Sequence, residues 1–225
     1  MKRINIRRSV LLLSMLLLVA CNEEITDFGF EGSLSGKVID QSGNIVAGDI
    51  TSGGFVVKAL GEHDEVAMTL RVKGDGTFSN MKLFPQKYQV WVEGPVVSDG
   101  EVTVDLTGNK AVTKDFVVTP FLAIDTPVLS GSATSSEMTV TYRITGNAGY
   151  TVATKELYCS MVPYPNASTG SGPYYTTIKL GLSAQSGTVT IAGLTAGTKY
   201  FIRVGAKANG ASAFNYSDQL IVTTP

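Results

Sequence analysis

The densest group of ionisable side chains lies in residues 61–65, which read Gly-Glu-His-Asp-Glu. Histidine and carboxylate groups bind metal ions and exchange protons, so this segment is the first place to look for a metal centre or an acid–base site. His63 is the only histidine of the chain, and no second ligand of that type stands at a metal-binding spacing. A solvated hairpin tip between two strands explains the segment better, and we expect no metal site.

Other arrangements that support catalysis are missing from the sequence. A Ser-His-Asp triad would have to use His63, yet no Gly-x-Ser-x-Gly elbow occurs. The carboxylates are scattered and stand mostly near predicted turns, so no pair suited to glycoside hydrolysis can be named. Gly74 and Gly76 lack the third glycine and the following helix of a nucleotide-binding loop. We therefore expect a protein that is not an enzyme and that needs no cofactor.

Two short segments, 40–44 and 105–109, superficially resemble calcium-binding loops because each begins with Asp and ends with Gly-Asn. Both lack the alternating carboxylates and the later bidentate glutamate of such loops. Turn formation by Asp, Gly and Asn explains them better.

Two groups of aromatic and amide residues are candidates for binding carbohydrate, because planar rings pack against sugars while nearby polar groups bond to hydroxyls. The predicted ligand-binding residues are Tyr164, Asn166, Tyr174 and Tyr175, which flank a Ser-Gly-rich stretch, and Phe214 and Tyr216, which precede the last strand. The two groups could lie close together or at opposite ends of a domain. For any single residue the alternative is inward packing. We assign Trp91, within an apolar run, to the core.

The first twenty residues have the pattern of a lipoprotein signal peptide. Four basic residues precede an apolar run from Val10 to Val19, and residues 18–21 read Leu-Val-Ala-Cys. The apolar run would form a helix only about 15 Å long, half the thickness of a hydrocarbon core. We therefore expect the chain to be cleaved before Cys21 and Cys21 to carry lipid. The acyl chains would anchor the protein to a membrane, and residues 21–31 would form the tether between the anchor and the first domain.

The charge of the chain excludes nucleic acid as a partner, and the number of cysteines excludes an intrachain disulfide. The signal segment has four basic and no acidic residues, so the remaining chain has 14 basic and 19 acidic side chains, a net charge near −5. That balance provides no basic surface for nucleic acid, which we exclude as a partner. With Cys21 lipidated, Cys159 has no partner for an intrachain disulfide.

From residue 22 onward the sequence is typical of an all-β protein, because alternating apolar and polar runs recur between Gly, Pro, Asn and Asp clusters. We expect two β-sandwich domains, residues 32–120 and 121–225. Asp75 and Gly76 indicate a tight hairpin turn, since Asp-Gly supplies a positive φ. The strands predicted for the first domain are 33–40, 55–60, 66–73, 77–81, 88–93, 102–106 and 112–118.

The strand at 36–40, the turn at Gly43, the Asp-Gly-Thr-Phe sequence at 75–78 and the run 87–90 resemble the transthyretin-like, carboxypeptidase-regulatory-like module. More narrowly, residues 75–84 and 116–122 resemble an uncharacterised family of two-domain lipoproteins from Bacteroidetes. Members of that family are encoded in polysaccharide-utilisation loci, beside an outer-membrane transporter and its glycan-binding lipoprotein partner. The acidic pair after Cys21 also resembles the export signal for the outer surface in these bacteria. The resemblance implies an outer-membrane location at the cell surface.

The second domain resembles a fibronectin type III domain. The run from Leu194 to Tyr200 matches the corner before the F strand, in which the tyrosine hydroxyl bonds to the main chain. Tyr142 stands at the position where that family usually has a tryptophan. Residues 138–144 correspond to the B strand of such a domain. The residues of this strand that are expected to face the core are Met138, Val140, Tyr142 and Ile144.

Together these features predict a non-catalytic surface lipoprotein that helps to capture polysaccharide or to assemble the transporter complex. The family resemblance carries the glycan part of this prediction, and the residues themselves carry the lipid anchor and the β-structure. The alternative is a structural or adhesive protein whose sandwiches bind another protein.

Overall fold

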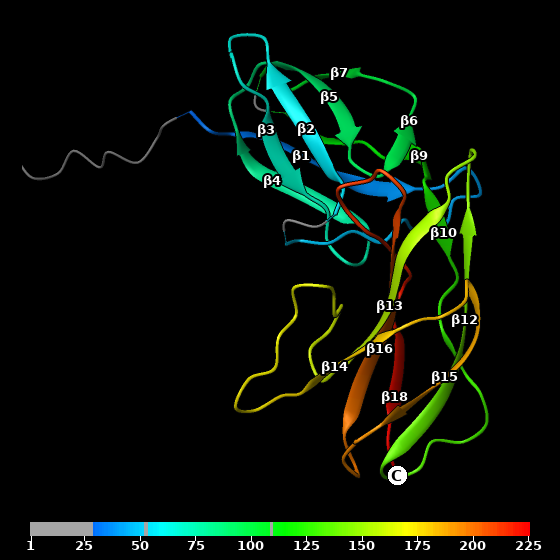
Figure 1. Ribbon diagram of the computed structural model, residues 1–225. Coiled ribbons are helices and arrows are strands. Elements are labelled where there is room, and N and C mark those ends of the chain that lie inside the picture. Colours follow the sequence, from blue (N-terminus) through cyan, green and yellow to red (C-terminus); the bar gives the residue numbers. More distant parts are fainter. Residues whose placement is uncertain (1–28, 52–53, 109) are drawn as a thin grey trace, which may run out of the picture. The chain divides into compact units, whose positions relative to one another are not determined.

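The computed structural model describes residues 29–51, 54–108 and 110–225, and within these every regular element is a β-strand (Figure 1). The predicted all-β fold class is therefore confirmed. In this part of the chain no helical segment could span a lipid bilayer. The predicted signal peptide, the predicted lipidation site Cys21 and most of the predicted tether lie outside the described residues.

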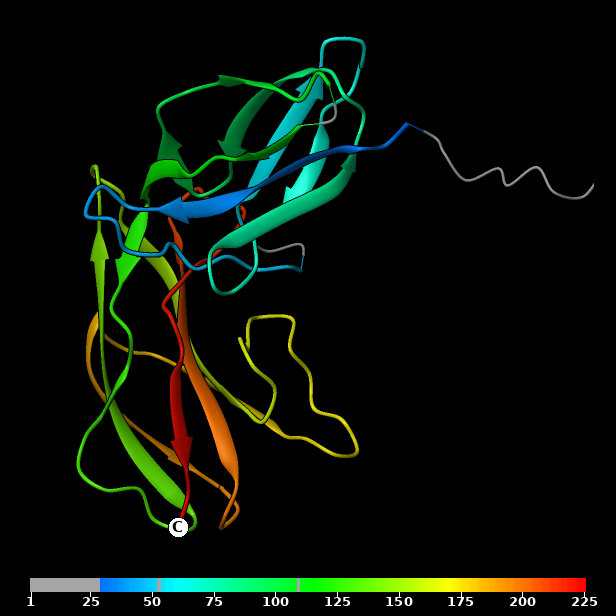
Figure 2. The same ribbon diagram turned by 180° about the vertical axis from the view of Figure 1, so that it is seen from behind.

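The strands of the first sandwich form two sheets. One sheet has the order β4 (Thr77–Leu83), β1 (Gly32–Ile39), β9 (Phe116–Pro120) and β6 (Val96–Ser98), with β8 (Ala111–Thr113) also paired to β1. The other has the order β3 (Met68–Arg71), β2 (Val56–Gly61), β5 (Lys87–Glu93) and β7 (Val102–Asp105). Figure 2 shows the blue β1 beside the teal β4, the pair that lies antiparallel.

Period-two alternation builds the first core, since successive side chains of a strand point to opposite faces. On β5, Tyr88, Val90 and Val92 are buried and face Leu34 and the other residues of the same cluster. Trp91 therefore points to the opposite face and is only half-buried. The prediction that Trp91 packs in the core is wrong, because its neighbours in the alternation occupy the inward positions.

The predicted strand at 112–118 is two strands, and both pair in parallel with β1. Between them Lys114 donates its N–H to the carbonyl of Ser35 at 2.8 Å, and Asp115 accepts a hydrogen bond from the N–H of Lys37 at 2.8 Å. These contacts interrupt the ladder, which alternation alone does not reveal. The three-residue β6 was also missed, because it is too short to show a pattern.

The Asp-Gly turn forms, but it does not make a hairpin. Gly76 has φ +74°, and the N–H of Lys73 donates to the carbonyl of Thr77 at 2.8 Å. The flanking strands β3 and β4 belong to different sheets. The predicted hairpin is therefore wrong, because the turn connects the two layers of the sandwich.

The second sandwich also has two sheets. One sheet pairs β12 (Glu137–Gly146) with β10 (Leu122–Ile124), β11 (Val128–Leu129) and β15 (Ser186–Ala192). The other has the order β14 (Thr177–Gly181), β13 (Val152–Ser160), β16 (Lys199–Ala208) and β17 (Asn215–Tyr216), with β18 (Leu220–Thr223) also paired to β16. This is the division of strands expected for a fibronectin type III-like sandwich.

The predicted features of this sandwich are confirmed. Met138, Val140, Tyr142 and Ile144 are all buried in the second core. The Tyr200 hydroxyl accepts a hydrogen bond from the N–H of Thr195 at 3.0 Å, as the tyrosine corner requires.

Two hydrophobic clusters mark the two sandwiches, one from Leu34 to Val118 and the other from Leu122 to Val222. Both belong to one compact unit, Glu31–Pro225, so the contacts between the two clusters of strands form part of a continuous structure. The boundary between residues 120 and 121 stays a prediction.

Candidate functional site

The loop between β13 and β14, residues 161–176, carries four of the six predicted ligand-binding residues. Pro163, Pro165 and Pro173 lie in this loop, and proline removes the N–H that a strand ladder needs. The yellow loop departs from the strands in Figures 1 and 2. One end of the loop contacts the first sandwich, and the other end carries the exposed Tyr174.

Tyr164 fixes the first end of the loop. Its backbone has φ +53°, which is uncommon for a residue other than glycine. Its N–H donates to Oε1 of Gln219 at 2.7 Å. The ring lies directly on the backbone of Gly74, where a Cβ atom would overlap it. Gly74 is thus needed for close contact with Tyr164.

Asn166 is buried and connects the loop to Asp49 of the first sandwich. Its Nδ2 donates to Oδ1 of Asp49 at 3.0 Å, while its Oδ1 accepts from the N–H of Ser168 at 2.9 Å. Asp49 Oδ1 also accepts from the N–H and the hydroxyl of Thr51, at 2.9 and 2.7 Å. Asn166 therefore positions Asp49 rather than facing solvent.

Arg203 is the centre of this region, and its side chain is fully buried, with 0 % exposed. Its Nε donates to the carbonyl of Ser217 at 2.7 Å, and its Nη2 donates to the carbonyl of Gly48 at 2.9 Å. Burial lowers the pKa of Arg203 to about 10, so the guanidinium stays charged near neutral pH. Arg203 thereby joins the second sandwich to the segment 48–49 of the first.

Tyr216 packs beside Arg203, with 4.5 Å from its ring centroid to the guanidinium carbon, a cation–π contact. Its hydroxyl accepts a hydrogen bond from the N–H of Ala167 at 3.3 Å. Burial, together with the carboxylate of Asp49, raises the pKa of Tyr216. Phe214 stacks near it at 5.8 Å between ring centroids. The structure thus brings Tyr164, Asn166 and Tyr216 together around Arg203.

The other end of the loop presents the remaining two tyrosines. The N–H of Gly172 donates to the carbonyl of Tyr175 at 2.9 Å, which closes a tight turn around Tyr174. Tyr174 is 90 % exposed, and the Tyr175 ring packs on the backbone of Gly172. Lys179 Nζ donates to the carbonyl of Ala167 at 2.6 Å and supports the loop from β14. Tyr174 is therefore an exposed ring on a hydrogen-bonded turn.

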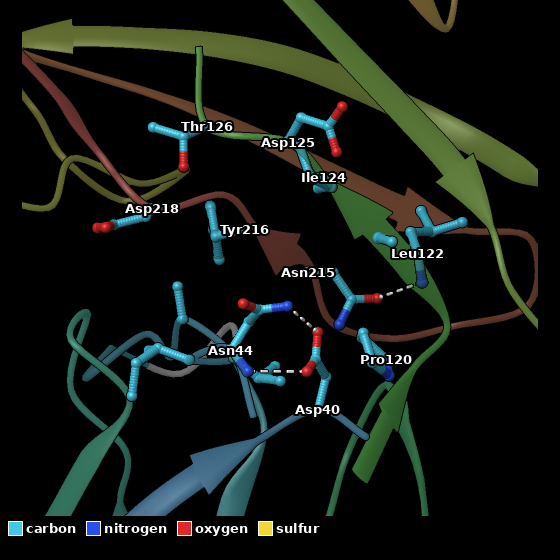
Figure 3. A pocket seen from close by; sticks show the side chains of 14 residues that line it. Asp40, Asn44, Pro120, Leu122, Ile124, Asp125, Thr126, Asn215, Tyr216 and Asp218 are labelled. Carbon is cyan, nitrogen blue, oxygen red and sulfur yellow. Dashed lines mark hydrogen bonds between the residues drawn. The ribbon is translucent and has the colours of Figure 1, made fainter. Parts of the chain in front are cut away.

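A hollow of about 450 Å³ is a cleft where residues of both sandwiches meet (Figure 3). Asp40, Asp125 and Asp218 contribute carboxylates to its lining, and Tyr216 closes part of it. The Asp40 carboxylate accepts hydrogen bonds from Asn44, from its N–H at 2.9 Å and from Nδ2 at 3.1 Å. Desolvation acts to raise the pKa of Asp40, but these and neighbouring hydrogen bonds outweigh it and hold the pKa below its usual value.

A second hollow, of about 360 Å³, lies against Tyr164. We call it the Tyr164 cavity. Its lining includes Asp49, Thr51, Lys73, Tyr164 and Asn166. The sequence predicted Tyr164 and Asn166 as ligand-binding residues. It did not predict Asp49 and Lys73, because both lie in loops, where no repeating pattern shows which way a side chain points.

His63 lies exposed in the connection between β2 and β3, where its imidazole is 3.8 Å from the carboxylate of the adjacent Glu62. Within the described ranges no three His, Cys, Asp or Glu side chains are grouped so that they could hold a metal ion. Residues 62–65 thus lie in the connection between two strands, as the sequence predicted.

No protein-family model and no curated protein matches the chain. Solved structures do match it over most of its length. A DUF3823 family protein from Parabacteroides merdae is similar with a TM-score of 0.64 and 23% identity, covering 85% of this chain and 98% of that one. A proposed carbohydrate-binding protein from Bacteroides uniformis has a TM-score of 0.67 and 19% identity, covering 87% and 100%.

The chain has the fold of these proteins. A DUF3823 family protein from Bacteroides ovatus also shares it, with a TM-score of 0.62, 19% identity, and coverage of 86% of this chain and 99% of that one. At these identities the likeness concerns the fold, and it agrees with the β-sandwich architecture predicted from the sequence.

Proposed function

We propose that this protein is a non-catalytic lipoprotein of the outer membrane that captures carbohydrate at the cell surface as part of a polysaccharide-utilisation system. The observation that carries the proposal is the exposed Tyr174 ring on a turn fixed by hydrogen bonds. A long polysaccharide must be bound from outside, so an exposed aromatic ring on an ordered loop suits it better than an enclosed cavity.

The hydroxyl groups of Ser171 and Thr177 brace the loop beside the Tyr174 turn. Ser171 accepts a hydrogen bond from the N–H of Thr177 at 2.9 Å, and the Thr177 hydroxyl donates to the carbonyl of Gly170 at 2.7 Å. These bonds hold the loop in one conformation and reduce the entropy lost on binding. The fold likeness to a proposed carbohydrate-binding protein supports the same function.

The test is affinity electrophoresis of the soluble protein, starting after Glu24, through gels that contain different polysaccharides. We expect one class of polysaccharide to retard the protein. Tyr174→Ala should abolish most of the retardation, while Tyr174→Phe should keep it because the ring remains. Val66→Ala, which removes another exposed apolar side chain, is the matched control and should migrate like the parent protein.

Retardation of Tyr174→Ala equal to that of the parent would rule out Tyr174 as the binding surface. No retardation by any polysaccharide would reject capture for the panel and favour a scaffold that contacts other surface proteins.

The anchor is tested separately in cells. Cys21→Ser should move the protein out of the membrane fraction, because no acyl chain can then be attached. An external protease should degrade the parent protein on intact cells. Protection from that protease would place the protein on an inner face and contradict the surface location.

A further inference from the structure

The Tyr164 cavity has the size and the two-sided lining of a small-molecule site. Its volume of about 360 Å³ falls within the roughly 300–1,000 Å³ typical of such pockets. Apolar groups come from Ile50, Val162 and Pro163, and the Tyr164 ring adds a planar surface. Ligand sites commonly combine an apolar wall with a few polar groups that fix orientation.

The polar group that distinguishes this cavity is Asp49. Its side chain is only 2 % exposed, and Oδ1 already accepts hydrogen bonds from Thr51 and Asn166. Oδ2 is buried and accepts no hydrogen bond within the part of the chain that is described. A buried acceptor left unpaired is costly, so a group that donates to Oδ2 would be stabilised there.

Tyr164 supplies a second, independent observation. A bulky residue at φ +53° is strained, and such strain is kept where the surrounding structure requires the side chain in one place. Here the ring is held between the backbone of Gly74 and the guanidinium of Arg203, whose carbon lies 5.8 Å from the ring centroid. The Tyr164 ring is therefore held in place before any ligand enters, whereas the side chains that cover Asp49 Oδ2 must shift slightly to admit a donor.

The charges of the lining limit the ligand. Asp49 and Asp75 are acidic and Lys73 is basic, and the buried guanidinium of Arg203 beside Asp49 supplies a second positive charge, so the charges around the cavity balance. Lys73 lies close enough to Asp75 to help lower the pKa of that carboxyl, and its charge is thus partly balanced. The atom left without a partner is a carboxylate oxygen, so a ligand with hydroxyl or amino donors matches it, whereas an anionic group placed beside that oxygen would be repelled.

We propose that the Tyr164 cavity binds a single saccharide ring, neutral or amino-substituted, whose hydroxyl or amino group donates to Asp49 Oδ2 while its apolar face packs on Tyr164. Small side-chain adjustments bring the donor to Oδ2. This site is separate from Tyr174 and does not depend on polysaccharide capture at the loop tip. It takes a free monosaccharide or the end unit of an oligosaccharide.

The test is isothermal titration of the soluble protein, starting after Glu24, with neutral hexoses, glucosamine, N-acetylglucosamine, a uronic acid and short oligosaccharides. We expect one neutral or amino sugar to bind, and the uronic acid to bind at least tenfold more weakly. Binding of the free sugar alone indicates a monosaccharide site, and tighter binding of the oligosaccharide indicates its end unit.

Two variants identify the cavity. Asp49→Asn keeps the size and one acceptor oxygen but cannot accept at the second position, so affinity should fall at least tenfold. Val162→Trp fills the cavity from its half-exposed rim and should also abolish binding, even if Asp49→Asn proves unstable. Val66→Ala, an exposed position outside the cavity lining, is the control and should bind the small sugar like the parent. Tyr174→Ala is measured beside it to tell the cavity from the loop tip.

Absence of binding by every sugar, or equal affinity in a folded Asp49→Asn and Val162→Trp, would overturn the proposal. Loss of small-sugar binding in Tyr174→Ala would also overturn it, because the loop tip would then be the site. Polysaccharide retardation is measured independently, so either proposal can fail without the other.

Discussion

At the scale of single residues, the protein keeps a charged guanidinium where solvent does not reach it. Arg203 satisfies its Nε and Nη2 with carbonyls of Ser217 and Gly48 and packs on Tyr216. Nη1 has no hydrogen bond within the described residues. Buried charge is tolerated because these partners replace most of the lost hydration.

Replacing Arg203 by Met should destabilise the protein strongly. The substitution leaves two carbonyls without donors and the nearby carboxylate of Asp49 without a compensating positive charge. We expect the free energy of unfolding to fall by about 3–5 kcal/mol. Urea denaturation measures it, with the exposed Arg143→Met on β12 as control, expected within about 0.5 kcal/mol of the parent. An equal, small effect in both variants would contradict this account.

Cys159 should be unreactive in the folded protein. Burial in the second core raises the pKa of its thiol from 9.0 to about 12. Because the nucleophile is the thiolate, an alkylating reagent at pH 8 should modify the protein starting after Glu24 only after unfolding. Rapid modification under native conditions, followed by mass spectrometry, would contradict burial of this side chain.

The same raised pKa predicts a pH dependence of stability. The protonated thiol is retained in the folded state, whereas the unfolded thiol ionises near pH 9.0. The contribution to stability is therefore complete below pH 9 and is lost as the pH rises towards 12. Urea midpoints at pH 8 and pH 10 should differ less in Cys159→Val than in the parent. An unchanged difference would assign the effect to other groups, such as the buried tyrosines.

At the scale of elements, the central strand β1 depends on one position without a side chain. A Cβ atom on Gly36 would overlap the carbonyl oxygen of Lys114, at the point where β8 ends and β9 has not begun. Alternation predicted β1 well, since it depends only on neighbouring residues. The interruption opposite Gly36 depends on a segment almost eighty residues later, and no local pattern contains it.

Gly36→Ala should therefore destabilise the first sandwich by about 1–3 kcal/mol, because the backbone has to move to admit the methyl group. Gly181→Ala on β14 is the matched control, since nothing lies within 4 Å of a Cβ atom there. The control should be neutral or slightly stabilising. Thermal unfolding followed by circular dichroism compares the two, and equal melting temperatures would refute the close contact.

The tyrosine corner is an element that the sequence alone predicted correctly. Tyr200→Phe removes only the hydroxyl that accepts from the N–H of Thr195. We expect a loss of about 1 kcal/mol in the free energy of unfolding. Tyr174→Phe removes an exposed hydroxyl and should change nothing. A stable Tyr200→Phe would mean that water replaces the bond without cost.

At the scale of the whole molecule, Asn215 holds the two sandwiches together. Its Nδ2 donates to the carbonyl of Pro95 in the first, at 3.0 Å, and its Oδ1 accepts from the N–H of Leu122 in the second, at 3.1 Å. These bonds are buried and join residues that are far apart in the chain.

Asn215→Leu should separate the unfolding of the two cores. The parent is expected to unfold in one calorimetric transition, since both cores belong to one compact unit. The variant leaves two buried groups unpaired and should show two transitions or a broader one. The exposed Asn209→Leu is the control and should keep one transition. Two transitions already in the parent would show that the cores are independent.

The sequence by itself determined most of the strands of the first sandwich, the class of fold and the tyrosine corner, because alternation and turn residues act over a few neighbouring positions. It also picked out Tyr164, Asn166 and Tyr216 as unusual. Only the tertiary structure decided what surrounds them. Arg203 lies on a strand face that would meet solvent in an isolated sandwich, since Tyr200, Ile202 and Val204 point to the core.

The segment 48–49 of the other sandwich covers that face and buries Arg203 with Tyr216. Because this segment is more than 150 residues away from Arg203 in the chain, the alternation of residues around Arg203 cannot predict that it is covered. The Tyr164 cavity has the same origin, because its two sides come from parts of the chain that meet only after both sandwiches have folded.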